Sequence, residues 1–121
     1  MRCILLHAAG RLPCVDAAAL APIDCWPAVR RFLRRVRPYA LVLVETELWP
    51  NMIELSARAG LRIGMVNGRI SQRSFPRYRL ASPFLRQFLE RLERVATRTE
   101  ADARRFAALG VPRDRLLVTG N

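Results

Sequence analysis

Histidine and cysteine are scarce in this sequence, and no run of apolar residues is long. The 121 residues include one histidine and three cysteines, Cys3, Cys14 and Cys25, which lack CxxC spacing. These numbers argue against a zinc site and against a disulfide framework, so we expect reduced thiols, no metal and no cofactor. The opening MRCILLHAAG is too short to span a membrane or to serve as a signal peptide. The sequence therefore predicts a soluble, cytoplasmic protein that at most touches a membrane.

Acidic residues are outnumbered two to one. The chain has 21 basic residues, all of them arginine, against 10 acidic residues, and its formal net charge is +11. This excess indicates an anionic partner, which could be a nucleic acid, a phosphorylated substrate or a membrane surface. A solvated basic face without a dedicated ligand would explain the same composition. The length and the apolar content otherwise fit one globular domain.

Short aliphatic runs alternate with segments of helical periodicity. The runs are CILL (3–6), ALVLV (40–44), RIGMV (62–66), RVAT (94–97) and LLVT (116–119). Runs of this length without polar alternation are typical of parallel strands that are covered on both faces. The alternation predicts an α/β fold, with a parallel sheet, flanking helices and right-handed crossovers.

The first helical segment carries an apolar stripe and a basic remainder. Positions spaced by three and four residues form the stripe, which consists of Val29, Phe32, Leu33 and Val36. The residues that point elsewhere are Arg30, Arg31, Arg34 and Arg35. Pro38 is expected to end this helix.

The later helices have recognisable ends. Pro50 lies in the first turn of one, and Gly60 follows its last turn. Ser82 is expected to cap the next, whose stripe contains Phe84, Leu85, Phe88, Leu89 and Leu92. The residues TEAD (99–102) form a capping box, and GVP (110–112) closes the helix that it opens.

The dipeptide Asn67–Gly68 has two interpretations. It is a frequent type I′ hairpin turn, but the RISQRSFPRYR that follows is polar and contains Pro76. We therefore expect a loop that leaves the carboxyl end of a strand. The chain stops at LLVTGN, where a doubly wound domain normally continues with a helix, so we expect it to be part of a longer domain.

Polar residues follow three of the predicted strands. In open α/β sheets, ligands bind outside the carboxyl ends of the strands, so these residues are candidates for one site. They are Glu45, Glu47, Asn51, Asn67, Arg69, Ser71, Arg73, Ser74 and Asn121. Carboxylates accept hydrogen bonds from hydroxyl groups, and arginine pairs with carboxylate or phosphate oxygens. The edge is therefore suited to a polyhydroxylated, anionic ligand.

Some of these residues, and Trp49 and His7 besides, have a simpler structural interpretation. Glu45 and Glu47 could cap the following helix, where negative charge is favourable. Trp49 is more often part of a core than a platform for a sugar. Arg69 and Arg73 could form a solvated surface, and a structural or exposed role is favoured for His7.

Three stretches closely resemble one family. They are APIDCWPAVRRFLRRVRPYALVLVETELWPN (21–51), VNGRISQRSFPRYR (66–79) and TEADARRFAALGVPRDRLLVTGN (99–121). They resemble the bacterial 3-deoxy-D-manno-octulosonic acid (Kdo) transferases of lipopolysaccharide synthesis, over roughly residues 21–121. Residues 1–20 do not carry the resemblance and are interpreted as a divergent or displaced start.

The resemblance implies a domain organisation and a set of partners. The family has a GT-B architecture, in which two Rossmann-like domains enclose the active site. Its members transfer Kdo from CMP-Kdo to a lipid A precursor at the cytoplasmic face of the bacterial inner membrane. Residues 21–121 would then be part of the acceptor-binding amino-terminal domain, without the CMP-sugar-binding domain. The acceptor is a bis-phosphorylated glycolipid in an anionic membrane, which accounts for the positive charge.

The family's functional residues transfer only in part. Its general base is a glutamate in a loop of the type HAxSxGE, whereas HAAGRLPC (7–14) contains no glutamate, so no base is assigned. Glu45 matches the first glutamate of ETELWP, to which the resemblance gives a role in transition-state stabilisation. Glu47 is the supporting candidate. The acceptor-binding candidates are Asn67, Arg69, Ser71, Arg73, Ser74 and Asn121.

We accordingly expect a Kdo transferase fragment that shows no transferase activity by itself. Two alternatives remain: a basic nucleic-acid-binding module, which rests on the charge alone, and a non-catalytic remnant of the enzyme that binds a lipid surface. The sequence shows no aromatic platform of the RNA-binding type, so no nucleic acid partner is expected.

Overall fold

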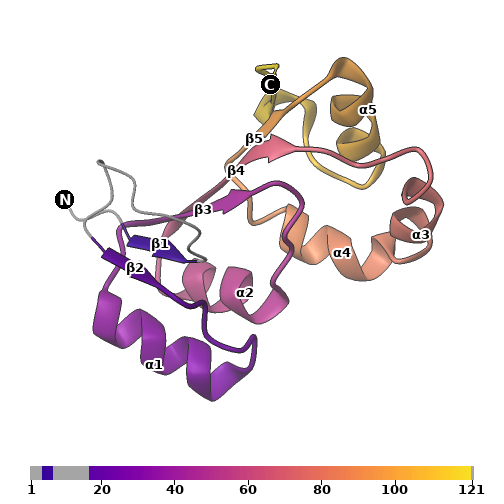
Figure 1. Cartoon of the computed structure of the whole chain (residues 1–121). Helices are drawn as coiled ribbons and strands as arrows, with labels where there is room; N and C mark the ends of the chain where they lie inside the picture. The colour runs from indigo at the N-terminus through magenta and orange to yellow at the C-terminus, as the bar shows by residue number, and fades with distance from the viewer. Residues whose placement is uncertain (1–3, 7–16, 121) are drawn as a thin grey trace.

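The computed structural model describes residues 4–6 and 17–120 and shows an α/β fold (Figure 1). Four parallel strands form the main sheet in the order β3-β4-β5-β6. Their bounds are Ala40–Val44 for β3, Arg62–Gly68 for β4, Arg94–Thr97 for β5 and Leu116–Val118 for β6. The Rossmann-like parallel sheet predicted from the sequence is confirmed, and Asn67–Gly68 forms no hairpin.

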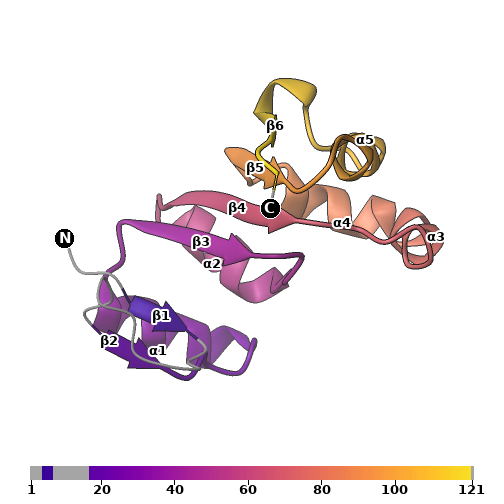
Figure 2. The same cartoon turned by 45° about the horizontal axis from the view of Figure 1, so that its top comes forward.

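A second, two-stranded parallel sheet lies beside α1 in both views (Figures 1 and 2). It pairs β1 (Ile4–Leu6), which was predicted, with β2 (Ala17–Ala19), which was not. The three alanines of β2 give no strand signal, because alanine is depleted in strands.

The helices largely follow their predicted ends. They are α1 (Trp26–Val36), α2 (Pro50–Arg58), α3 (Phe75–Leu80), α4 (Ser82–Leu89) and α5 (Glu100–Ala108), with a 3-10 turn at Arg113–Arg115. Gly60 and Gly110 follow α2 and α5 with φ of 77° and 110°, a conformation that favours glycine. Thr99 caps α5 by accepting the N–H of Asp102, as the capping box predicted.

Two predictions about α3 and α4 were wrong. The segment from Phe75 was expected to be loop, but Pro76 occupies the first turn of α3, where its missing N–H costs no hydrogen bond. Ser82 is the first residue of α4 and makes no capping bond, because α3 runs almost directly into α4 through Ala81. Phe84 belongs to the predicted apolar stripe but is 56% exposed, and it packs edge-on against Phe88.

One face of the sheet carries the core. Ile53 of α2, Leu89 of α4 and Phe106 of α5 form a single cluster with strand residues such as Met65 and Val95. Residues paired across parallel strands point to the same face, and Met65 is paired with both Leu43 and Val95. The sequential strand order with right-handed crossovers therefore places α2, α4 and α5 on the same side.

The opposite face of the sheet is open in the part of the chain that is described. Its exposed residues are Val42, Val44, Val66 and Leu117. The prediction of strands covered on both faces was wrong for these residues, because an aliphatic run indicates apolar surroundings on both sides but not which segment supplies them.

Helix α1 extends the covered side. Val29 is fully buried against Met52 and Leu55 of α2, and Phe32 and Leu33 pack around them. The predicted apolar stripe is thus confirmed for Val29, Phe32 and Leu33. No helix within residues 4–6 and 17–120 is long and apolar enough to cross a membrane.

Candidate functional site at the carboxyl edge of the sheet

The parallel strands bring Glu45 and Arg69 together, although they lie 24 residues apart. Glu45 directly follows β3 with a φ of 61°, and its N–H continues the ladder by donating to the Val66 carbonyl at 2.9 Å. This left-handed turn aims the carboxylate at the Arg69 guanidinium, with 3.3 Å between Oε2 and Nη2. The two side chains are 46% and 52% exposed, so the pair contributes at most about 1 kcal/mol to stability and stays accessible to a ligand.

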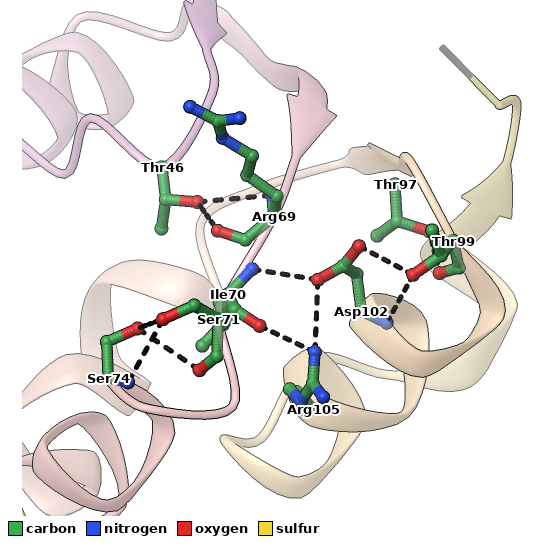
Figure 3. A network of polar contacts seen from close by, with 9 residues as sticks. All are labelled: Thr46, Arg69, Ile70, Ser71, Ser74, Thr97, Thr99, Asp102 and Arg105. Carbon is green, nitrogen blue, oxygen red and sulfur yellow. Dashed lines mark hydrogen bonds and ion pairs between the residues drawn. The ribbon is translucent and has the colours of Figure 1, made fainter.

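Thr46 joins the same two loops through the backbone. Its hydroxyl donates to the Arg69 carbonyl and accepts the Arg69 N–H, the latter at 3.2 Å (Figure 3). A single side chain therefore satisfies both backbone groups of Arg69. This fixes the base of the Arg69 side chain relative to Glu45.

Glu47 and Trp49 form a separate contact. The indole N–H of Trp49 donates to Glu47 Oε2 at 3.0 Å, and the ring packs against the cluster of Val29, Met52 and Leu55. Trp49 is thus part of the core, as the simpler interpretation predicted. Glu47 lies on the same loop and is bound by Trp49, whereas Arg69 pairs with Glu45.

The start of α2 is capped by Asp24, not by Glu45 or Glu47. The Asp24 carboxylate accepts the N–H groups of Asn51 and Met52 at 3.1 and 2.9 Å. The Asn51 amide donates to the Asp24 carbonyl at 2.7 Å. Asn51 is therefore engaged in connecting the approach to α1 with α2, and the two glutamates are left for other roles.

Asn67 occupies a strained and enclosed position near the end of β4. Its φ is 53°, in the left-handed region where asparagine is tolerated better than most residues. Its Oδ1 is buried and has no hydrogen-bond partner among the described residues. The register between β4 and β5 shifts here, between Met65 and Gly68.

Ser71 and Ser74 bond to each other and form the turn before α3. Their hydroxyl oxygens lie 2.7 Å apart, and the Ser74 N–H donates to Ser71 Oγ at 3.1 Å. Arg73 lies exposed between them. Asn121, the last candidate, lies outside the described residues, as does His7.

Helix α5 holds this loop by binding the backbone of Ile70 through Asp102 and Arg105 (Figure 3). The Ile70 N–H donates to Asp102 Oδ1 at 2.9 Å, and the Ile70 carbonyl accepts from Arg105 Nη1 at 2.7 Å. Asp102 also accepts the Thr99 hydroxyl at 2.6 Å and lies 3.4 Å from Arg105. Ile70 itself is 1% exposed, so the clamp fixes the residue next to Arg69.

Asp102 remains ionised in this environment. Burial alone raises its pKa, but the Thr99 hydroxyl, the Ile70 N–H and the Arg105 cation together outweigh burial. The pKa of Asp102 therefore lies below the ordinary value for aspartate. A charged carboxylate makes stronger hydrogen bonds, which suits a clamp.

The organising residues Asp24, Thr46, Asp102 and Arg105 were not among the predicted site residues. Asp24 and Arg105 act on partners 27 and 35 residues away, and no local pattern reports such contacts. Asp102 was identified as a helix cap, but its bond to Ile70 uses the carboxylate oxygen that faces away from Thr99. The only sequence signal for a role of Thr46 was its position between Glu45 and Glu47.

The geometry of the fold and of this edge defines a class of protein. Among the residues with described positions, no group of three histidine, cysteine or acidic side chains could hold a metal. The edge instead offers an accessible carboxylate beside a guanidinium, suited to hydroxyl groups and to anions. This is an α/β protein whose Rossmann-like parallel sheet carries polar residues at the edge where such sheets bind ligands.

The chain belongs to the Kdo transferase family of glycosyltransferases, since the family described as 3-deoxy-D-manno-octulosonic-acid transferase (kdotransferase) matches residues 6–121. A bifunctional glycosyltransferase/methyltransferase of Fusobacterium nucleatum is 37% identical over 100 residues, 83% of this chain and 16% of that protein. A 3-deoxy-D-manno-octulosonic acid transferase of Haemophilus influenzae is 32% identical over 100 residues, 83% of this chain and 23% of that protein. The chain thus spans less than a quarter of the length of either relative.

Proposed function

We propose that the chain forms part of the acceptor-binding amino-terminal domain of a GT-B Kdo transferase. The complete enzyme would transfer Kdo from CMP-Kdo to a lipid A precursor at the cytoplasmic face of the bacterial inner membrane. The observation that carries the proposal is the accessible Glu45–Arg69 pair at the carboxyl edge of the sheet. The family match covers both residues.

The proposed chemistry gives Glu45 an electrostatic role. A hydroxyl of the acceptor sugar loses its proton to a base and attacks the anomeric carbon of Kdo, while CMP leaves. Positive charge develops on the sugar ring as the bond to CMP breaks, and a fixed carboxylate stabilises that charge. Arg69 orients Glu45 through the contact at 3.3 Å. No residue of this chain is assigned as the base.

The other candidates surround this pair. We assign acceptor binding to Asn67, Arg69, Ser71, Arg73, Ser74 and Asn121, with the arginines contacting the acceptor's phosphates. Arg73 is exposed and free to turn toward an anion, whereas the hydroxyls of Ser71 and Ser74 already form the turn that presents it. Glu47 has a supporting role, since it orients Trp49 and with it the loop between β3 and α2.

An NMR titration tests acceptor binding. The ligand is the water-soluble bis-phosphorylated sugar obtained by removing the acyl chains from a lipid A precursor. We expect amide shifts in the loops 45–51 and 67–74. We also expect the Arg69→Gln substitution to weaken binding by about tenfold, since a hydrogen bond to a charged group contributes roughly 1.5–3 kcal/mol.

Arg113→Gln is the matched control, because Arg113 is exposed and precedes β6, at the opposite edge of the sheet. The Arg113→Gln control should bind the sugar as tightly as the unchanged chain does. The unchanged chain should bind the same sugar weakly once the phosphates of the sugar are removed. Shifts confined to other surfaces, or equal affinities of the two variants, would refute the assignment of the acceptor site.

The 121 residues alone are expected to show no transfer. CMP-Kdo and a lipid A precursor are incubated with the chain, and Kdo incorporation into lipid is measured, with the Haemophilus influenzae relative as the positive control. The physical reason is that a transferase needs a donor site and a base besides the acceptor edge. Transfer above the blank would contradict this expectation.

A further inference from the structure

The outer face of α1 is a concentrated patch of positive charge. Over its 11 residues, WPAVRRFLRRV, the helix has four arginines and no acidic residue. Val29, Phe32 and Leu33 pack against α2, and the arginines on the rest of the helix are exposed; they are Arg30, Arg31, Arg34 and Arg35. We call these four residues the α1 arginine face.

These arginines are not used within the described structure. All four are exposed, and none has a carboxylate of the described residues within ion-pair distance. Other arginines of the chain do pair, among them Arg58 with Glu54 and Arg62 with Glu93. The α1 arginine face therefore has charge available for an external anion.

An aromatic and apolar margin adjoins the charge. Trp26 and Pro27 line one open groove together with the four arginines. Trp26 is 41% exposed, and the Arg58 guanidinium lies 5.0 Å from its ring centroid, which holds the ring in place. The approach to the helix exposes Leu20 and Ile23 to 85% and 81%. Apolar and indole groups beside arginines are characteristic of segments that lie in the interface of a bilayer.

The start of α1 is tied to the candidate site. Asp24, two residues before α1, holds the first N–H groups of α2, the helix that follows β3 and Glu45. Any surface that binds the start of α1 is therefore placed beside the carboxyl edge of the sheet. A lipid-embedded acceptor would be presented on that side.

We propose that the α1 arginine face and Trp26 dock onto the surface of a bilayer rich in anionic phospholipid. Each arginine near such a surface contributes roughly 1 kcal/mol, and the indole enters the interfacial region. A nucleic acid would use the charge but would leave Leu20 and Ile23 exposed to water, so the bilayer accounts for more of the surface. The inference concerns phospholipid, not the acceptor sugar, and is independent of the Glu45–Arg69 assignment.

Co-sedimentation with vesicles tests the proposal. The vesicles contain phosphatidylglycerol, pure phosphatidylcholine or a mixture of the two, and no lipid A precursor. Replacing the four arginines of the α1 arginine face by glutamine should weaken binding to phosphatidylglycerol by about a hundredfold or more, given the contribution of each arginine. Glutamine and arginine have similar helix propensities, and circular dichroism verifies the fold.

A second fourfold variant controls for net charge. It replaces Arg79, Arg98, Arg104 and Arg113, which are exposed and lie on other elements. Since it loses the same charge, it should bind the vesicles within about threefold of the unchanged chain if the position of the arginines matters. If vesicle binding weakened equally in the two fourfold variants, or was retained equally in both, the proposal would be overturned.

Tryptophan fluorescence provides a readout that needs no change to the arginines. In a Trp49→Phe variant Trp26 is the remaining tryptophan, and its emission should shift to the blue and be quenched by brominated lipid. An unshifted emission with bound vesicles would contradict docking through Trp26. If DNA at matched salt bound more tightly than phosphatidylglycerol and lost that binding in the α1 variant, the face would be a nucleic-acid surface and the proposal wrong.

Discussion

Replacing Asp102 by alanine is expected to lower the free energy of unfolding by about 3 kcal/mol. The carboxylate is 6% exposed and accepts the Ile70 N–H and the Thr99 hydroxyl while neutralising Arg105. Without it, the buried Ile70 N–H has no acceptor and the partly buried Arg105 has only the Ile70 carbonyl and no carboxylate partner, and each such loss costs roughly 1–3 kcal/mol. Urea unfolding followed by circular dichroism measures the change.

Asp114→Ala is the matched control. Asp114 is exposed, and it is its backbone carbonyl that accepts from Arg94. The same chemical change at this surface position should alter stability by no more than about 0.5 kcal/mol. A comparable loss in both variants would show that the clamp on Ile70 does not stabilise the fold.

The contribution of Asp102 also depends on pH in a defined direction. Its folded-state pKa lies below that of an unfolded aspartate, so its ionised form stabilises the fold above about pH 4. This contribution is lost as the pH falls through the folded-state pKa. The stability difference between the unchanged chain and an Asp102→Asn variant should therefore shrink in acid. A difference that grew below about pH 4 would have the wrong sign.

The sequence predicted the elements better than their surroundings. The strands at 40–44, 62–66, 94–97 and 116–119 could be recognised because aliphatic runs and helix ends are local signals. The exposure of one face of the sheet could not be predicted, since the segments that cover a sheet depend on strand order and on contacts between distant parts of the chain. Helix α3 was missed because Pro76 indicates a break inside a helix but is favourable in a first turn.

The same distinction applies to the site. Glu45 and Arg69 were placed on one edge by topology alone, and the structure brings them into contact. The geometry that makes the contact depends on details that spacing does not encode. These are the left-handed backbone at Glu45, the two bonds of Thr46 to Arg69 and the clamp from α5. The roles of these residues in transfer remain predictions for the titration and the activity assay.

Helix α5 thus supports the site in two ways, one polar and one apolar. Asp102 and Arg105 hold the backbone of Ile70, and the next residue of α5, Phe106, packs against Gly68. A Cβ on Gly68 would lie 3.1 Å from Phe106 Cε2 and 3.3 Å from Met65 Sδ, so glycine permits this close approach. The chain around Arg69 is therefore fixed by residues more than 30 positions later in the sequence.

Phe106→Ala is expected to lower the free energy of unfolding by about 4 kcal/mol, because truncating a buried phenylalanine typically costs 3–5 kcal/mol. Phe106 is fully buried and belongs to the cluster that joins α2, α4 and α5 to the sheet. The cavity would open directly beneath Gly68, so the amides of the 67–70 segment should also exchange faster with solvent.

Phe84→Ala makes the same chemical change at a side chain that is 56% exposed and should cost roughly 1 kcal/mol, chiefly its edge-on contact with Phe88. Urea unfolding and hydrogen exchange on both variants decide the matter: equal losses of stability, or unchanged exchange at 67–70 in Phe106→Ala, would show that α5 does not support the site loop.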